Sequence, residues 1–209
     1  ELVSFVKPNE IAAIGLTGQM HGMVALNNNG SVLRPCIMWN DQRSHLECDE
    51  ITQKVGQDKV LSITGNPVLP GFTAPKILWT QKHEPDLFSS IHKVVLPKDF
   101  IRYKLTGSFF SDVSDASGTS LLDVGKRTWS QEMFDALGWP ISWMPEVTES
   151  TEVSSKVSEE ASLLTGLLAG TPVVAGGGDQ AAQAVGCGIV EEGLVSATLG
   201  TSGVVFAQS

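Results

Sequence analysis

The chain has 209 residues, of which 42% are hydrophobic and 18% are charged, as in ordinary globular proteins. Its formal net charge of −9 argues against nucleic acid as the main partner, because a nucleic-acid-binding surface needs clustered Lys and Arg and the sequence has no basic run. An anionic cosubstrate such as a nucleotide would therefore be received by backbone amides and a metal ion. The 21 glycines and 10 prolines imply many tight connections, which favour an α/β fold over a helical bundle.

The cysteines and the hydropathy of the sequence indicate in which compartment the protein is expected. Cys36, Cys48 and Cys187 form an odd, scattered set, so neither a disulfide framework nor a zinc site is predicted and a reducing cytoplasm is the simpler location. No apolar run approaches the roughly 20 residues of a membrane helix, so no membrane partner is expected. The chain begins without Met, in what resembles the end of a helix, and stops within an apparent strand at 204–207. These ends predict a fragment of a longer protein.

The first half of the chain predicts three strands and two helices. Apolar runs at 11–16 and 22–26 predict buried strands, and a third strand is predicted at 32–39 after the turn 27–30. Pro35 interrupts this third run, which favours an edge position or a bend. A polar-faced helix is predicted at 44–55 and an amphipathic helix at 73–83.

The second half of the chain also predicts a mixture of strands and helices. Residues 94–105 predict a strand that enters a helix, and 109–113 begin another extended segment. Residues 126–144 predict a helix with its loop, whose three tryptophans are expected in the core. The acidic, serine-rich segment 146–160 is expected to be solvated. Strands are predicted at 172–175, 194–199 and 204–206.

Asp179 begins a predicted helix directly after a strand and three glycines, which allow a sharp turn and a close approach. One interpretation is a carboxylate held at the floor of a cleft as a general base. The other is a helix N-cap that accepts a hydrogen bond from a first-turn amide. The motif alone favours the cap.

Three further segments allow both a functional and a structural interpretation. His21 follows the first strand between two glycines and either binds a polyol hydroxyl or is an idle polar residue. Asp41 and Arg43 either form a site or cap the following helix. Lys76, at the start of a helix, invites a role for its ammonium, although a surface lysine with a buried stem is the commoner case. Residues 111–119 are rich in Ser, Thr and Asp. They either form turns and helix caps or line a polar pocket, and the first interpretation is preferred.

The turn Gly200–Gly203 joins two predicted strands and offers amides and the hydroxyls of Thr201 and Ser202 to a phosphate, or is a plain hairpin turn. No Walker A pattern and no well-placed GxGxxG is present, so neither a P-loop kinase nor a Rossmann dehydrogenase is supported.

Several stretches together resemble the FGGY carbohydrate kinases, and they span nearly the whole chain in the order of that family. The ordered set, rather than any one match, carries the resemblance. The matching stretches are GLTGQMHG at 15–22, WNDQR at 39–43, GFTAPKILW at 71–79, LPKDF at 96–100, SDVSDASGT at 111–119, GGGDQAA at 176–182 and LGTSG at 199–203.

The resemblance implies an actin-like, ribonuclease-H-like ATPase fold of two domains and ATP-dependent phosphorylation of a sugar. Asp179 matches the catalytic aspartate of the family. Met20, His21 and Gln180 match sugar contacts, although many relatives have Asn at position 180. The turn of Gly200, Thr201 and Ser202 matches a phosphate-binding hairpin. The triplet at 19–21 favours D-xylulose as the substrate, with D-xylulose 5-phosphate as the product.

By the same resemblance, residues 1–190 correspond to most of the first, sugar-binding domain and 191–209 to the start of the ATP-binding domain. ATP and Mg²⁺ are the expected cofactors, held mostly by parts outside this chain, and no metal ligand is predicted within it. A small-molecule sugar is the expected partner, and a homodimer is one assembly to test. The alternatives are another FGGY kinase, acting on ribulose, gluconate, glycerol or a deoxy sugar, and a non-catalytic sugar-binding relative.

Overall fold

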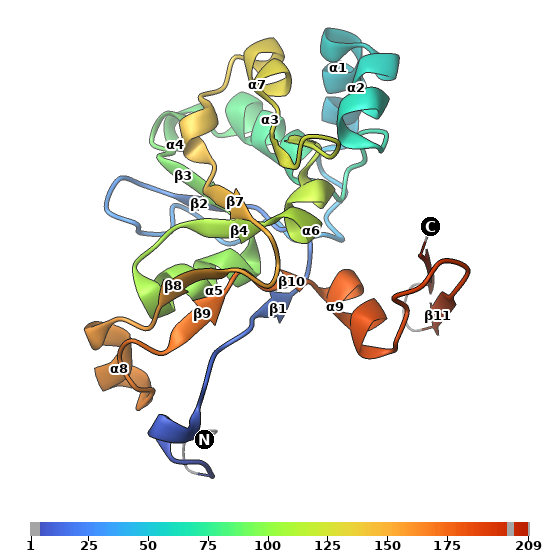
Figure 1. Ribbon diagram of the computed structural model, residues 1–209. Helices are drawn as coiled ribbons and strands as arrows, with labels where there is room; N and C mark the ends of the chain where they lie inside the picture. The colour runs from blue at the N-terminus through green and yellow to red at the C-terminus, as the bar shows by residue number, and fades with distance from the viewer. Residues whose placement is uncertain (1–4, 200–202, 209) are drawn as a thin grey trace.

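The computed structural model describes residues 5–199 and 203–208 (Figure 1). The α-helices are α1 (His45–Val55), α2 (Gln57–Thr64), α3 (Thr73–His83), α4 (Pro85–Ser89), α5 (Pro97–Thr106), α6 (Val113–Ala116), α7 (Gln131–Leu137), α8 (Glu159–Thr165) and α9 (Asp179–Gly186). Short 3-10 helices are η2 (Pro8–Glu10), η3 (Ser117–Thr119) and η4 (Ile141–Trp143).

Within the described residues the strands pair two by two. Two pairs are parallel, β1 (Thr17–Gly18) with β10 (Gly177–Gly178) and β4 (Phe110–Asp112) with β7 (Glu146–Thr148). The antiparallel pairs are β2 (Val24–Leu26) with β3 (Lys93–Val95), β5 (Leu122–Asp123) with β6 (Thr128–Trp129), β8 (Val153–Lys156) with β9 (Pro172–Val174), and β11 (Val195–Leu199) with β12 (Gly203–Ala207). The predicted α/β class is confirmed.

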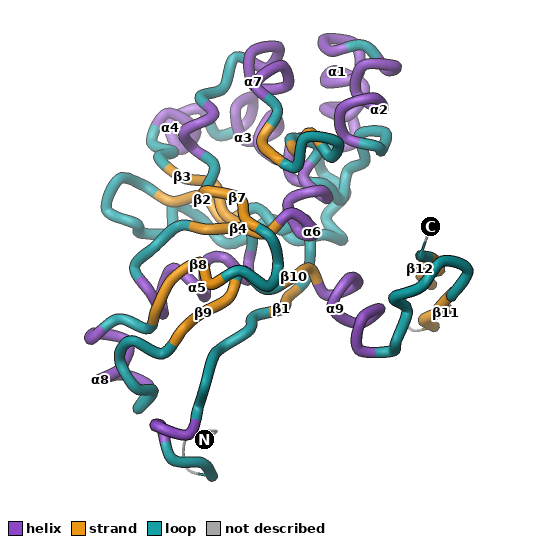
Figure 2. Tube along the Cα trace, viewed as in Figure 1, coloured by secondary structure: helices purple, strands orange, loops and turns teal. Residues whose placement is uncertain are grey.

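Helices α1, α2, α3 and α7 gather at one end of the molecule, above the strand pairs β2–β3 and β4–β7 (Figures 1 and 2). Their apolar faces meet in the largest core cluster, in which Ile51, Ile77 and Phe134 are fully buried. Each such side chain contributes about 1.5–3 kcal/mol on burial. Trp139 lies in this core, and Trp129 and Trp143 pack against it, so the structural interpretation of the tryptophans is confirmed.

The predicted helices are found close to their expected bounds. Helix α3 coincides with the prediction for 73–83, α1 begins one residue later than predicted, and α5 ends before Gly107 in the left-handed conformation that favours glycine. The hairpin β11–β12 and the strands β2, β3 and β9 confirm the corresponding apolar runs.

Two sequence predictions are wrong in part. The run 11–16 is not a buried strand: none of its residues is buried, and only Ile14 forms a bridge, to Val173. The run 32–39 makes two isolated bridges, at Val32 and Ile37, and Pro35 between them cannot donate to a ladder. The segment 146–160 is solvated as predicted, with Val157 its only buried residue, and it also contains β7 and β8, which pair with β4 and β9.

In the part of the chain that the structure describes, no helix has both the length and the apolar character needed to cross a membrane.

Candidate active site

A cavity of about 220 Å³ opens where the loop after β1 meets the start of α9. The parallel pairing of β1 with β10 causes this meeting, since the chain leaves both strands at the same edge. The cavity is lined by Gln19, Met20, His21, Trp39, Asp179, Gln180 and Val204. The structure therefore brings together four residues that the sequence singled out, Met20, His21, Asp179 and Gln180.

Glycines make this close approach possible. A Cβ on Gly176 would overlap the carbonyl of Leu16, and Gly176 also has a φ of +77°, which side-chain-bearing residues rarely adopt. A Cβ on Gly178 would lie 2.7 Å from Cγ of Met20, so the Met20 side chain packs directly on the backbone that precedes Asp179. The glycine turn predicted before Asp179 is confirmed, with two of its glycines forming β10.

Asp179 is the first residue of α9, and Gly178 holds the N-cap position. The interpretation of Asp179 as the N-cap is therefore wrong. Its carboxylate lines the cavity at the N-terminal end of the helix, where the helix dipole favours a negative charge.

His21 is fixed from two sides. Its Nδ1 lies 2.7 Å from the carbonyl oxygen of Gly118, and its ring stacks on Phe72 with centroids 4.6 Å apart. Because a carbonyl only accepts, Nδ1 carries the proton, which leaves Nε2 of the neutral ring as an acceptor. Burial lowers the pKa of His21, opposed by the bond to Gly118, so the neutral form dominates at pH 7. The ring lines the cavity, and its contact with a polyol hydroxyl stays a prediction.

Lys76 is fully buried, which overturns the expectation of a surface lysine. Its Nζ donates to the carbonyl oxygens of His21, at 2.8 Å, and Gly71, at 2.6 Å. Thr73 Oγ1 also donates to the carbonyl of His21, at 3.2 Å. Burial lowers the pKa of Lys76 to about 8. Lys76 thus ties the start of α3 to the loop that carries His21, whose φ is +69°.

Three cavity residues, Gln19, Trp39 and Val204, are not among the site residues proposed from the sequence. Gln19 and Trp39 stand in motifs that carry the family resemblance, which is the available signal for them; Val204 has no such signal. Gly200, Thr201 and Ser202 lie outside the described residues, and their assignment to phosphate stays a prediction.

Asp41 and Arg43 bind each other rather than a helix end. Arg43 Nε donates to Asp41 Oδ1 at 2.9 Å, and the Arg43 guanidinium lies over the ring of Trp79, 4.7 Å from its centroid. Neither lines the cavity. The segment 111–119 does supply the predicted cap, because the Asp112 carboxylate accepts from the amides of Ser114 and Asp115 at the start of α6.

The described residues contain no group of three or more His, Cys, Asp or Glu side chains arranged to hold a metal ion. The cavity instead gathers a carboxylate, a neutral imidazole acceptor, an amide and a thioether. This set can hydrogen-bond several hydroxyls of a polyol and accept a proton from one of them.

Comparison with known proteins identifies a family and several relatives that this chain resembles. A family model described as the N-terminal domain of the FGGY family of carbohydrate kinases matches residues 3–186. The xylulose kinase of Escherichia coli (strain K12) is 49% identical over 200 residues, which cover 96% of this chain and 41% of that protein.

Solved structures agree. The "xyloylose kinase" from Brucella ovis is 45% identical, with a TM-score of 0.89, over 99% of this chain and 42% of that one. The xylulose kinase from Rhodospirillum rubrum is 32% identical, with a TM-score of 0.88, over 93% of this chain and 40% of that one. The chain thus spans about two fifths of the length of these relatives.

Proposed function

The chain belongs to the FGGY family of carbohydrate kinases, and from that membership we propose that the protein containing it phosphorylates D-xylulose with ATP. The product is D-xylulose 5-phosphate. The observation that carries the proposal is the cavity that gathers Asp179 with Met20, His21 and Gln180. The names of its relatives in Escherichia coli and Rhodospirillum rubrum support D-xylulose as the substrate.

In this proposal Asp179 is the general base. Its carboxylate accepts the proton of the primary hydroxyl of the sugar while the hydroxyl oxygen attacks the γ-phosphorus of ATP. Phosphoryl transfer depends mainly on positioning and on stabilising charge, so the site needs no covalent nucleophile of its own.

The other cavity residues hold the sugar. Nε2 of His21 accepts a hydrogen bond from a sugar hydroxyl, because Nδ1 is engaged with Gly118. The amide of Gln180 both donates and accepts, and Met20 packs against the carbon face of the sugar. These contacts fix the hydroxyl near Asp179, which lowers the entropic part of the barrier.

ATP is the phosphoryl donor expected for the family, and we assign Gly200, Thr201 and Ser202 to its phosphates. Mg²⁺ would neutralise phosphate charge when bound, but no step above depends on it. We assign residues 1–190 to the sugar-binding domain and 191–209 to the start of the ATP-binding domain. The isolated chain should then be inactive, since most of the ATP site lies outside it. A cytoplasmic location and a homodimer are further parts of the proposal, the latter tested by the mass of the full-length protein in solution.

The test is a coupled ADP-release assay on the full-length protein with D-xylulose, D-ribulose, L-ribulose, glycerol and gluconate, and with the 209-residue chain alongside. A strong preference for D-xylulose and a silent isolated chain are expected. Preference for another polyol would reassign the substrate while keeping Asp179 as the base. Silence of the full-length protein on every sugar would favour a non-catalytic sugar-binding protein.

A further inference from the structure

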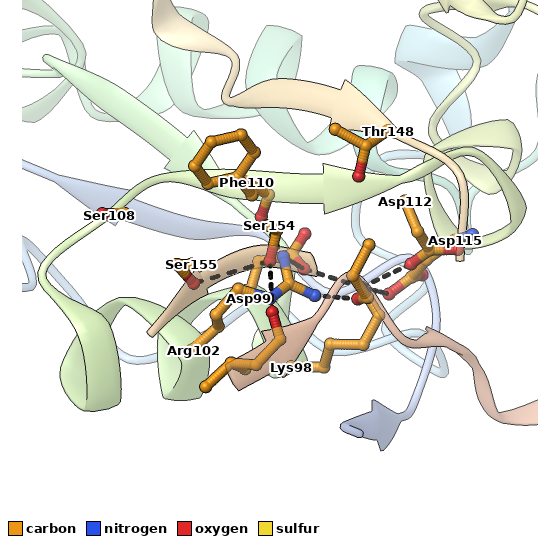
Figure 3. Close-up of polar contacts among 12 residues, drawn as sticks. Lys98, Asp99, Arg102, Ser108, Phe110, Asp112, Asp115, Thr148, Ser154 and Ser155 are labelled. Atoms are coloured by element: carbon orange, nitrogen blue, oxygen red, sulfur yellow. Dashed lines mark hydrogen bonds and ion pairs between the residues drawn. The ribbon is translucent and has the colours of Figure 1, made fainter. Parts of the chain in front are cut away.

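A buried ionic cluster joins residues of α5, β4 and α6. Lys98 Nζ is 2.6 Å from Asp99 Oδ1, 2.7 Å from Asp112 Oδ2 and 3.3 Å from Asp115 Oδ2 (Figure 3). Arg102 Nη1 is 3.1 Å from Asp99 Oδ1. All five side chains are at most 1% exposed. Two cations facing three carboxylates in this setting are costly to assemble, which makes a purely stabilising role a weak explanation.

One hydroxyl connects this cluster to the residue before Asp179. Ser114 Oγ donates to Asp112 Oδ1 at 2.5 Å and accepts from the backbone N–H of Gly178 at 3.1 Å. The two bonds together define the orientation of the hydroxyl. Asp112 is in turn fixed by Lys98 and by the amides of Ser114 and Asp115.

The cluster also holds the two ends of the glycine turn. Arg102 Nη2 donates to the carbonyl of Ala175, just before the turn begins. A Cβ on Gly18 would lie 3.1 Å from Cβ of Lys98, so the backbone of β1 rests directly on the Lys98 stem. The strand before the 19–21 loop, β1, and the segment before Asp179 are thus both in contact with the same ionic cluster.

We infer that Ser114 is a positioning residue for Asp179, acting through the Gly178 amide, with the Lys98 cluster as its rigid support. The inference rests on the proposed role of Asp179 as the base. Asp179 follows Gly178 directly, so a rotation of the Gly178 peptide moves the carboxylate relative to the sugar hydroxyl. A displacement of about 1 Å in such a group costs on the order of 100-fold in rate.

The chain offers a matched control for this role. Ser111 is fully buried on β4, close in sequence to the same cluster, and its hydroxyl has no hydrogen-bond partner among the described residues. Ser111→Ala therefore removes a hydroxyl of the same size without touching Gly178. In Ser114→Ala, Asp112 keeps the two backbone amides that it accepts from, so the fold should survive.

The experiment compares the full-length wild-type protein with Ser114→Ala and Ser111→Ala, by steady-state kinetics and by amide hydrogen exchange of the peptide that spans 176–182. In Ser114→Ala, kcat should fall by about 10- to 100-fold, with the KM values for sugar and ATP changed less than about twofold. The exchange of the Gly178 amide should accelerate by about 2- to 10-fold, because its acceptor is lost. Ser111→Ala should match the wild type in both measurements.

Two results would overturn the inference. Equal kcat values in the two variants would show that Ser114 does not position the base, and an unchanged Gly178 exchange rate would show that the hydroxyl does not hold this turn. If the wild type phosphorylates none of the sugars, it is the proposed function that fails. The exchange comparison then decides on its own whether Ser114 fixes the segment before Asp179.

Discussion

Gly118→Ala tests whether the fixed position of His21 sets the affinity for the sugar. Gly118 lies in η3 with its Cα against the His21 ring, and an added Cβ would fall within 3.0 Å of both Cε1 and Nδ1. It would also lie 3.1 Å from Cε of Met20. The backbone of Gly118 is outside the left-handed region, so alanine brings no backbone strain of its own.

The size of the effect follows from this geometry. Ordinary contact begins at 3.4 Å, so the ring has to move by about 1 Å and lose its bond to the Gly118 carbonyl. Displacing the ring removes the hydrogen bond that Nε2 accepts from a sugar hydroxyl, worth about 0.5–1.5 kcal/mol. At 1.4 kcal/mol per factor of ten, the KM for the sugar should rise by about 2- to 12-fold. The overpacking itself lowers the free energy of unfolding by about 1–3 kcal/mol, at the lower end because a side chain rather than the backbone has to move.

The assay is steady-state kinetics of the full-length protein with D-xylulose varied at saturating ATP, and the reverse. The double variant Gly118→Ala/His21→Ala is the control, because the clash vanishes when the ring is absent. The two substitutions should therefore be strongly non-additive in the sugar KM. An unchanged sugar KM in Gly118→Ala, or additive effects in the double variant, would refute the role given to His21.

Three further predictions concern charged groups. Asp179→Asn should abolish turnover and leave circular dichroism and Tm unchanged; substantial residual activity would remove Asp179 as the base. Burial raises the pKa of Asp115 to about 7, opposed by Lys98, so the folded state holds an extra proton between about pH 4 and 7 and the free energy of unfolding falls as pH rises through that window. Asp115→Asn should remove that fall, about 2.5 kcal/mol between pH 5 and 7.5, in urea titrations at those two pH values; an unchanged slope would contradict the shift. Because burial lowers the pKa of Lys76 to about 8, unfolding free energy should instead rise from pH 8 to 10.5, by about 3 kcal/mol, and Lys76→Met should abolish this rise.

The sequence predicted local structure well where one residue type determines it. Gly107 ends α5, and Thr73 begins α3 at the predicted position, because caps and periodicity act within a few residues. Strand pairing, in contrast, could not be predicted locally. The polar segment 146–160 is solvated as predicted, but its two strands form because β4 and β9 supply their partners, and no local pattern carries that information.

The candidate site shows the same contrast between local motifs, which the sequence reveals, and tertiary contacts, which it does not. Asp179, Met20, His21 and Gln180 were identified from motifs, but the motifs did not reveal what holds them. Lys76 is expected at the surface because lysine usually lies there, whereas it is buried with its Nζ donating to the nearby carbonyl of Gly71 and to the carbonyl of His21, which is distant in sequence. The Lys98 cluster likewise depends on three aspartates from separate elements, so only the folded arrangement shows it.

The seam between β1 and β10 limits how this cavity can be redesigned. Gly176 and Gly178 each face an atom that leaves no room for a methyl group, and Gly18 is nearly as tight, so a side chain added at any of these three positions would disturb the pairing. A change of substrate preference has to come from the side chains that line the cavity, among them Met20, His21 and Gln180. A library aimed at new sugars should vary these three positions and leave the glycines untouched.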